Sequence, residues 1–346
     1  MSGRKQERPL IAPIFIPHQG CPYQCIYCQQ EKITSQIETR VSGSHIKNLL
    51  DRVLKTRGFS SHNQREVAFY GGTFTRLGFK RMKELLEAVK PYLDNGFFKS
   101  IRVSTRPDEI DGKGLELLRD YNVSTVELGV QSMDDKVLRL SRRGHTSEDT
   151  VASVKMLKQY GFKVGAQLMP GLPGDSEDKF RRGIKKVIEF KPDMVRLYPA
   201  IVINGTVLAD WYNRGRYQPL TLEKAITICR ESCISLESMG IPVIRIGLMA
   251  SPSLLEKGLI VAGPWHSALG FLVRSDIHHE KIRPLLPGPG KVSKIGIRAP
   301  ERELPLIRGY KNQGFHFIEI TTGARIVYIK PDDSVPDGRI EVDEIG

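Results

Sequence analysis

The stretch SIRVSTRPDEIDGKGLELLRDYNVSTVELGV, residues 100–130, decides the fold class. It begins and ends with segments that are predicted to be strands, at 100–105 and 124–130. Between them, residues 114–121 place leucines at the spacing of one helix face. A helix that connects two successive strands is the crossover connection of parallel strands. This unit therefore predicts an α/β fold with a parallel sheet.

The same alternation extends in both directions from this unit. Further strands are expected at 11–17, 67–70, 163–168, 194–198 and 243–246, and further helices at 45–54, 79–92, 146–160, 175–190 and 222–239. Capping boxes are predicted to open helices at Ser132 and Thr146. The order of elements fits both an open doubly wound sheet and a barrel. In either case, functional residues should follow the carboxyl ends of the strands.

The chain changes character near its C-terminal end. Prolines and glycines in 284–290 predict a linker. Two β-rich runs, 315–321 and 324–330, flank Thr322-Gly323 and predict a hairpin. We therefore expect two domains, a core at residues 1–282 and a small β-rich region at 283–346. The pair His278-His279, just before this boundary, is expected to be solvated.

The composition is that of an ordinary globular protein with a basic surplus. The 346 residues are 40% hydrophobic and 26% charged, with a net charge of +13. Residues 1–282 hold most of this surplus, with 42 basic and 30 acidic residues. This balance favours a polyanionic partner or an anionic substrate, although a basic surface can also serve solubility. No apolar run could span a membrane and the N-terminus lacks a signal peptide's apolar region, so a cytoplasmic protein is expected.

Three cysteines lie within eight residues, in Cys21-Pro-Tyr-Gln-Cys25-Ile-Tyr-Cys28. A zinc site would need a fourth ligand, and His18 is the histidine nearest to them. A [4Fe–4S] cluster held by three thiolates would leave one iron open to a substrate. The remaining cysteines, Cys229 and Cys233, lie four apart on a predicted helix. They are expected to be buried as small hydrophobic residues.

The C-x3-C-x2-C spacing, with Tyr27 before the last cysteine, resembles the radical S-adenosylmethionine (radical SAM) family. The resemblance implies a partial (β/α)6 TIM-like barrel and a [4Fe–4S] cluster on Cys21, Cys25 and Cys28. It also implies reductive cleavage of S-adenosyl-L-methionine to a 5′-deoxyadenosyl radical, which abstracts hydrogen from a substrate. Such chemistry needs an electron donor of the flavodoxin or ferredoxin type.

The resemblance also implies a set of S-adenosylmethionine contacts. They fall at Tyr27, Gly71, Gly72, Thr73, Ser104, Arg106, Gln131, Arg143, Met169 and Tyr198. Thr73 stands where the family's Gly-Gly-Glu motif has its acidic residue. Arg143 is expected to pair with the methionine carboxylate, and Arg142 is the alternative.

Segments 104–108, 126–132 and 143–146 resemble the elongator catalytic-subunit-like branch and, in part, oxygen-independent coproporphyrinogen dehydrogenases. The elongator subunit carries an acetyltransferase domain, for which the 64 residues from Arg283 onward are too few. Three readings stay open: a radical enzyme acting on transfer RNA, one acting on a small anionic metabolite such as a tetrapyrrole, and a non-catalytic cluster carrier or sensor. Trp265 and His266 form either a substrate wall or a loop anchor.

Overall fold

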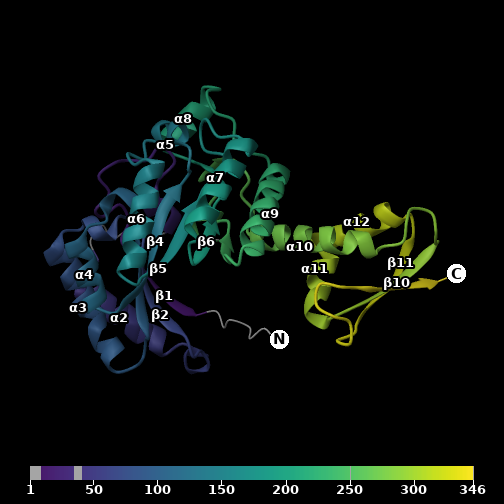
Figure 1. Cartoon of the computed structure of the whole chain (residues 1–346), viewed down its shortest axis with the longest axis horizontal. Helices are drawn as coiled ribbons and strands as arrows, with labels where there is room; N and C mark the ends of the chain where they lie inside the picture. Colours follow the sequence, from purple (N-terminus) through teal and green to yellow (C-terminus); the bar gives the residue numbers. More distant parts are fainter. Residues whose placement is uncertain (1–8, 35–40, 250, 346) are drawn as a thin grey trace.

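A curled sheet of seven parallel strands forms the larger part of the molecule (Figure 1). The computed structural model describes residues 9–34, 41–249 and 251–345. In spatial order the strands are β1 (Leu10–Phe15), β2 (Arg65–Tyr70), β3 (Ser100–Thr105), β4 (Val123–Gln131), β5 (Lys163–Leu168), β6 (Met194–Leu197) and β8 (Val243–Ile246). Each neighbouring pair is parallel. This half-barrel confirms the expected α/β partial barrel.

Helices cover the convex face of the half-barrel. Those that share the apolar core with the sheet are α2 (Gly43–Leu54), α3 (Phe79–Asp94), α4 (Gly112–Asp120), α6 (Ser147–Gln159), α7 (Glu177–Phe190) and α9 (Leu222–Ser238). Three shorter helices, α1 (Gln30–Thr34), α5 (Asp135–Leu140) and α8 (Val207–Asn213), lie in the segments after β1, β4 and β6. Two short strands, β7 (Val202–Ile203) and β9 (Ile260–Ala262), pair antiparallel beyond the end of β6. Within the described ranges, none of the helices is both long and apolar enough to cross a bilayer.

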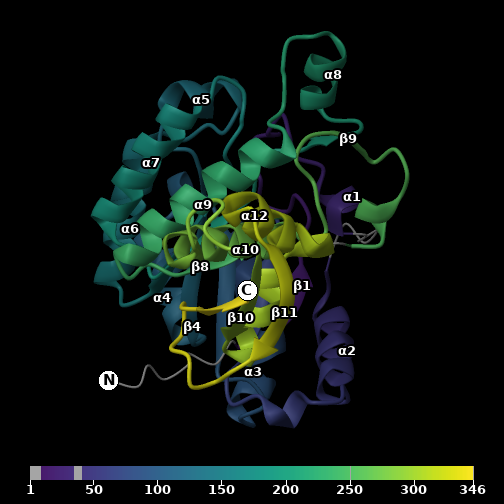
Figure 2. The same cartoon turned by 90° about the vertical axis from the view of Figure 1, so that its right-hand side faces the viewer.

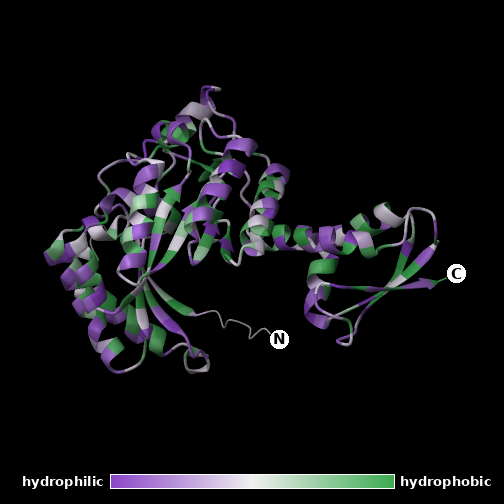
Figure 3. Cartoon of the chain, viewed as in Figure 1, coloured by the Kyte–Doolittle hydropathy of each residue, from purple (hydrophilic) through white to green (hydrophobic). Residues whose placement is uncertain are grey.

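The two faces of the sheet differ in polarity because side chains alternate along each strand. Buried apolar residues face the helices, among them Val67, Phe69, Ile101, Val103, Val126, Leu128, Val195 and Leu197. Figure 3 shows hydrophilic residues on the outer sides of α6 and α7, with hydrophobic residues on the strands behind them. The intervening positions carry Glu66, Arg102, Glu127 and Arg196. The concave face is therefore polar.

The capping prediction is confirmed at one helix and wrong at another. Thr146 and Asp149 form the expected capping box at the start of α6. At α5, however, the N-cap is Asp134, whose carboxylate accepts from the N–H groups of Lys136 and Val137. Asp134 takes this position because the Ser132 hydroxyl instead accepts from its backbone N–H (3.1 Å).

A separate three-stranded sheet lies near the C-terminus. Its elements are β10 (Lys294–Ala299), α11 (Leu304–Arg308), α12 (Gln313–Thr322), β11 (Arg325–Pro331) and β12 (Glu341–Ile345). The strand order is β11-β10-β12, with β11 parallel and β12 antiparallel to β10. Together with two packed helices, this sheet has its own apolar core. We call residues 286–345 the C-terminal unit.

The hairpin predicted around Thr322-Gly323 is wrong, because residues 313–322 form helix α12. Ile318 and Thr322 are both buried, one helical turn apart on the same face. Gly323 then ends the helix in the left-handed conformation, with φ of 71°. The β-branched residues that suggested a strand are thus held in a helix by tertiary burial.

Helix α10 (Leu269–Ile282) joins the described part of residues 9–268, which we call the large unit, to the C-terminal unit (Figures 1 and 2). It packs against α9 on one side and against α11 and α12 on the other. The expectation that His278 and His279 are solvated is wrong, since both are buried. His279 donates to the Ile307 carbonyl (3.1 Å from Nε2) and stacks on Phe317, 5.1 Å between ring centroids. These contacts fix the C-terminal unit to the helix.

Candidate active site

The residues predicted to contact cofactor come together at the carboxyl edge of the half-barrel. The cysteine loop follows β1, Gly71-Gly72 follow β2, and Ser104 lies at the end of β3. Gln131 ends β4, and Met169 and Tyr198 follow β5 and β6. Because parallel strands end at the same edge, six separate segments of the chain converge here.

The three cysteine thiols lie in a partly buried loop, in which Cys25 is buried and Cys21 and Cys28 are half-buried. Cys25 is buried and accepts from the Arg143 guanidinium, 3.2 Å from Nη1 to Sγ. Cys21 Sγ lies 3.5 Å from the Thr73 hydroxyl, which is itself fully buried. Burial, together with the neighbouring Cys25 and Cys21, raises the pKa of Cys28 to about 12. The thiols are therefore near enough to influence each other's ionisation.

The donor set fits an iron–sulfur cluster better than a single ion. Among the described residues, no three His, Cys, Asp or Glu side chains are arranged to hold one metal ion. His18 Nε2 accepts the Gln30 N–H (3.0 Å), so that lone pair is not available to the zinc site considered above. The three thiols of the C-x3-C-x2-C loop remain, which is the number that a cluster with one open iron uses.

Two buried polar atoms beside the thiols support this fit. Arg143 Nε and the Tyr27 hydroxyl are buried without a hydrogen-bond partner in the described part of the chain. Leaving such groups unpaired is unfavourable, since each loses its hydration. A bound group that contacted either atom would remove part of this cost.

Gly71 and Gly72 allow the cysteine loop to lie directly on the end of β2. Both have positive φ, 76° and 61°. A Cβ at Gly72 would lie 2.6 Å from the Ile16 carbonyl oxygen, so only glycine fits. The Gln30 Oε1 atom accepts from Gly72 N (2.9 Å) and His18 N (2.6 Å). The sequence did not single out Gln30, because an isolated glutamine after the last cysteine forms no motif.

The structure distinguishes the three candidate arginines. Arg143 is buried and reaches both Cys25 and the Gly129 carbonyl (2.5 Å from Nη2), whereas Arg142 is exposed. Arg106 is buried in a bidentate pair with Asp108 (2.9 and 2.8 Å) and also donates to the Arg143 carbonyl. Arg106 therefore positions the Arg143 segment.

The remaining predicted residues line the edge next to the thiols. Gln131 is buried with φ of 65°, and its side-chain oxygen accepts from Gln167 Nε2 (3.2 Å). Its carbonyl accepts from Met169 N (2.9 Å). Met169 packs with Tyr27 in a small apolar cluster. Ser104 shares the concave side of β3 with Arg102, by the alternation of the strand.

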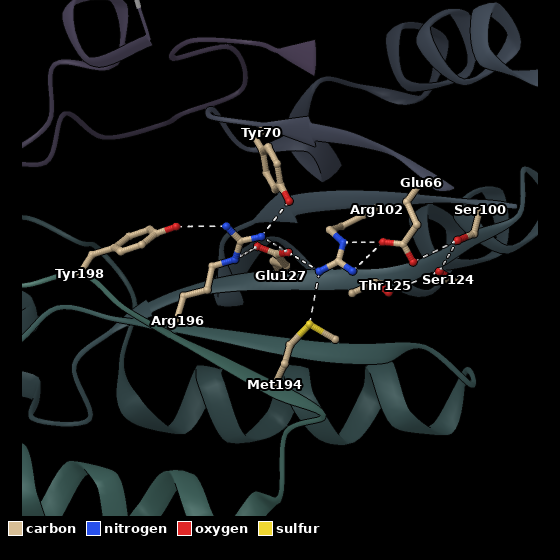
Figure 4. A network of polar contacts seen from close by, with 10 residues as sticks. All are labelled: Glu66, Tyr70, Ser100, Arg102, Ser124, Thr125, Glu127, Met194, Arg196 and Tyr198. Carbon is tan, nitrogen blue, oxygen red and sulfur yellow. Dashed lines mark hydrogen bonds and ion pairs between the residues drawn. The ribbon is translucent and has the colours of Figure 1, made fainter. Parts of the chain in front are cut away.

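A network of charged side chains fills the concave face below this edge (Figure 4). The Glu127 carboxylate is shared between Arg102 (2.7 Å) and Arg196 (2.9 Å). Arg102 also pairs with Glu66 (2.6 Å). Arg196 donates to the hydroxyls of Tyr70 (2.8 Å) and Tyr198 (3.0 Å). The predicted contact Tyr198 is thus one end of a network that spans β2, β3, β4 and β6.

Sequence reasoning missed this network, although a signal was present. Glu66, Arg102, Glu127 and Arg196 each stand between apolar residues of a predicted strand or at its border. Charged residues at such positions are expected only where they are paired.

We expect Glu127→Gln to lower the free energy of unfolding by about 3–5 kcal/mol, because it removes the carboxylate shared by the buried Arg102 and the half-buried Arg196 and leaves only Arg102 with another carboxylate, Glu66. Urea unfolding followed by circular dichroism measures this change. Glu116→Gln, the same substitution at an exposed position of α4, should have little effect. Equal stabilities of the two variants would contradict the assignment of Glu127 as the shared partner.

His145 is expected to make the stability of the protein depend on pH. Burial, followed by the nearby Arg143, lowers the pKa of His145 to about 3. Its Nε2–H donates to the Val130 carbonyl (3.2 Å). In the unfolded chain this histidine takes up a proton below about pH 6.5. The free energy of unfolding should therefore fall as the pH drops from 6.5 towards 3.

The histidine contribution can be isolated with His145→Gln, which removes the titrating group. Between pH 7.5 and 4.5, the wild-type chain should lose about 2–3 kcal/mol more stability than the variant. Urea unfolding at both pH values measures the difference. The same loss in both proteins would show that His145 is not held neutral.

Comparison with known proteins identifies the family. The radical SAM superfamily pattern matches residues 15–187, half of the chain. The radical SAM C-terminal domain matches residues 192–279. Together the matches extend from the end of β1 into α10.

Three similar proteins extend the comparison. A tRNA uridine(34) acetyltransferase of Dehalococcoides mccartyi is 31% identical over 231 residues, which are 58% of this chain and 50% of that protein. The heme chaperone HemW of Lactococcus lactis is 27% identical over 210 residues, 60% of this chain and 54% of that protein. The solved structure of Elp3 from Methanocaldococcus infernus covers 78% of this chain and 63% of its own, with 24% identity and a TM-score of 0.60. The chain thus spans about half the length of these curated relatives.

Proposed function

Because this chain belongs to the radical SAM superfamily, we propose that Cys21, Cys25 and Cys28 hold its [4Fe–4S] cluster and that the carboxyl edge of the half-barrel binds S-adenosyl-L-methionine. The observation that carries this proposal is the convergence of three thiols with the buried Arg143 at that edge. When bound, the cluster supplies the electron for reductive cleavage of S-adenosylmethionine, which yields methionine and a 5′-deoxyadenosyl radical.

Arg143 has two roles in this proposal. Its Nη1 donates to Cys25 and its charge offsets that of the thiolates. Its unpartnered Nε–H is available to a carboxylate, as expected for the methionine moiety. Arg106 keeps the segment in place through Asp108 and the Arg143 carbonyl. Cofactor binding would then satisfy a buried donor that the protein alone leaves open.

The other edge residues would orient the cofactor and keep water away. Gly71 and Gly72 have no side chains, so their backbone could approach the methionine moiety of S-adenosylmethionine closely. Thr73 is fully buried against Cys21, so it supports the loop rather than replacing a carboxylate. Ser104 and Gln131 offer polar contacts to the nucleoside, while Tyr27, Met169 and Tyr198 provide its apolar and aromatic surroundings.

We further propose transfer RNA as the substrate. The similar D. mccartyi protein carries the name of an enzyme that acts on transfer RNA, and the basic surplus of residues 1–282 suits a polyanion. A one-electron donor of the flavodoxin or ferredoxin type would reduce the cluster. Free cysteines and a reducible cluster both suit the cytoplasm.

A small anionic metabolite is the second candidate. The similarity to a heme chaperone favours it, as does Arg245 on β8. Arg245 is in register with Arg196, so it shares the concave side of the sheet, and it forms no ion pair within the described residues. One arginine on a concave face is suited to a single carboxylate.

The cluster assignment predicts that Cys25→Ala loses its iron and its iron–sulfur absorption after anaerobic reconstitution, because three thiolates are needed to hold the cluster. Iron analysis and absorption spectra measure this. Cys229→Ala removes a fully buried cysteine away from the site and should keep the cluster. A full cluster in Cys25→Ala would refute the assignment.

The substrate assignment predicts that transfer RNA raises the rate of 5′-deoxyadenosine formation under anaerobic, reducing conditions. An unrelated RNA of equal length should not do so, because a basic surface alone binds any RNA. Chromatography of the nucleoside product measures the rate, with Cys25→Ala as the blank. Stimulation by a tetrapyrrole instead would favour the second candidate, and no cleavage under any condition would favour a non-catalytic cluster protein.

A further inference from the structure

The turn between α11 and α12 presents two cations that the protein does not neutralise. Arg308 ends α11 and Lys311 lies in the turn, and both are exposed. Neither forms an ion pair with a residue that the structure describes. Four acidic residues of the C-terminal unit pair with other arginines, since Arg298 holds Asp332, Glu341 and Asp343 and Arg302 holds Asp337. The turn is therefore a positive surface.

Aromatic rings accompany these cations. The Arg308 guanidinium lies 5.7 Å from the Phe315 ring centroid, and Lys311 Nζ lies 5.5 Å from that of Tyr310. Tyr310 and Phe315 are both half-buried, so part of each ring faces solvent. Cations next to accessible rings are what single-stranded nucleic acids require, because cations meet phosphates and rings stack with bases.

The backbone of the turn suits close approach of a chain. Gly309, Lys311 and Asn312 all have positive φ, of 69°, 49° and 63°. A Cβ at Gly314 would overlap the Ile307 carbonyl oxygen, so the two helices cross in contact. Parallel strands β10 and β11 are thus joined by two helices with a tight, glycine-led turn between them. KH modules also place a glycine-containing turn, Gly-x-x-Gly, against the backbone of four nucleotides; here the two glycines, Gly309 and Gly314, lie five positions apart.

The turn also touches the large unit near its carboxyl edge. Tyr310 packs edge-on against His266, with ring centroids 4.8 Å apart. The segment that contains His266 packs against the residues that follow β6, since Gly263 lies directly beside Ala200 and Ile201. Trp265 packs there with Ile201 and Ile203, which makes this segment a loop anchor. A chain held at the turn would thus begin beside the edge that gathers the predicted site.

We propose that the turn 309–314, with Arg308 and Lys311, binds single-stranded RNA and holds it beside the carboxyl edge of the half-barrel. The inference deepens the proposed function and rests on it for its purpose, but the binding itself needs neither cluster nor cofactor. Arg308 and Lys311 would meet phosphates, and Tyr310 and Phe315 would stack with bases.

The test is the affinity of the full chain for a fluorescein-labelled single-stranded RNA 12-mer, measured by anisotropy without S-adenosylmethionine or reductant. The double variant Arg308→Glu/Lys311→Glu should raise Kd about tenfold or more. Lys330→Glu is the matched control, since Lys330 is also an exposed cation of this unit against an aromatic ring, 4.4 Å from that of Tyr328. It should leave Kd within about twofold of the wild-type value.

Salt dependence gives a second readout that does not rely on charge reversal. In Arg308→Gln/Lys311→Gln, the slope of log K against log salt should decrease in magnitude by about 1.4, the value for two contacts to single-strand phosphates. Ultraviolet cross-linking of the unaltered chain, which needs no variant, should place nucleotides on the tryptic peptide 312–325, which contains Phe315.

The outcomes separate this inference from the proposed function. Unchanged affinity and slope in the glutamine variant, or cross-links confined to residues 9–282, would overturn the turn as the RNA site even if transfer RNA stimulates cleavage. Equal affinity for a duplex of the same sequence would overturn single-strand recognition. The variants could lose RNA affinity while the unaltered chain never cleaves S-adenosylmethionine. That result would support RNA binding at the turn and refute the proposed enzymatic activity.

Discussion

The Glu127 carboxylate, shared between Arg102 and Arg196, is the interaction on which the half-barrel depends. Parallel sheets are usually covered on both faces, but helices cover only the convex face of this one. An apolar concave face would collapse or aggregate, whereas buried charges are tolerated only when paired. Glu127 joins β4 to β3 and β6, and Arg102 extends the network to Glu66 on β2. The network therefore links four strands of the sheet from its concave side.

Most of the large unit could be predicted because its signals are local. The strands read as apolar runs, and parallel pairing follows from the helices that connect them. The position of the site then follows without any side-chain detail, since all carboxyl ends lie at one edge. Cys21, Cys25 and Cys28 were singled out as candidate cluster ligands by their spacing, and Cys229 and Cys233 are buried as their helical spacing predicts. In each of these cases, a short stretch of sequence is enough to predict the feature.

What the sequence did not predict depends on contacts between distant segments. Gln30 ties the cysteine loop to Gly72, a link that no motif records. Arg106 pairs with Asp108 and also donates to the carbonyl of the distant Arg143, a contact that no motif indicates. His279 is buried only because α11 and Phe317 pack against it. Helix α12 contains residues that favour strands, and burial of Ile318 and Thr322 on one face outweighs that preference.

Helix α10 would affect which nucleotide of a long RNA substrate reaches the candidate active site. It packs against α9 in the large unit and against α11 and α12 in the C-terminal unit, so it sets the separation between them. A nucleic acid held at the turn could reach the cysteine loop only across that fixed span. The reacting nucleotide would then be selected by the number of nucleotides that separate it from the bases bound at the turn. Base identity at the reacting position would matter less than distance, and lengthening α10 by one turn would move the selected position.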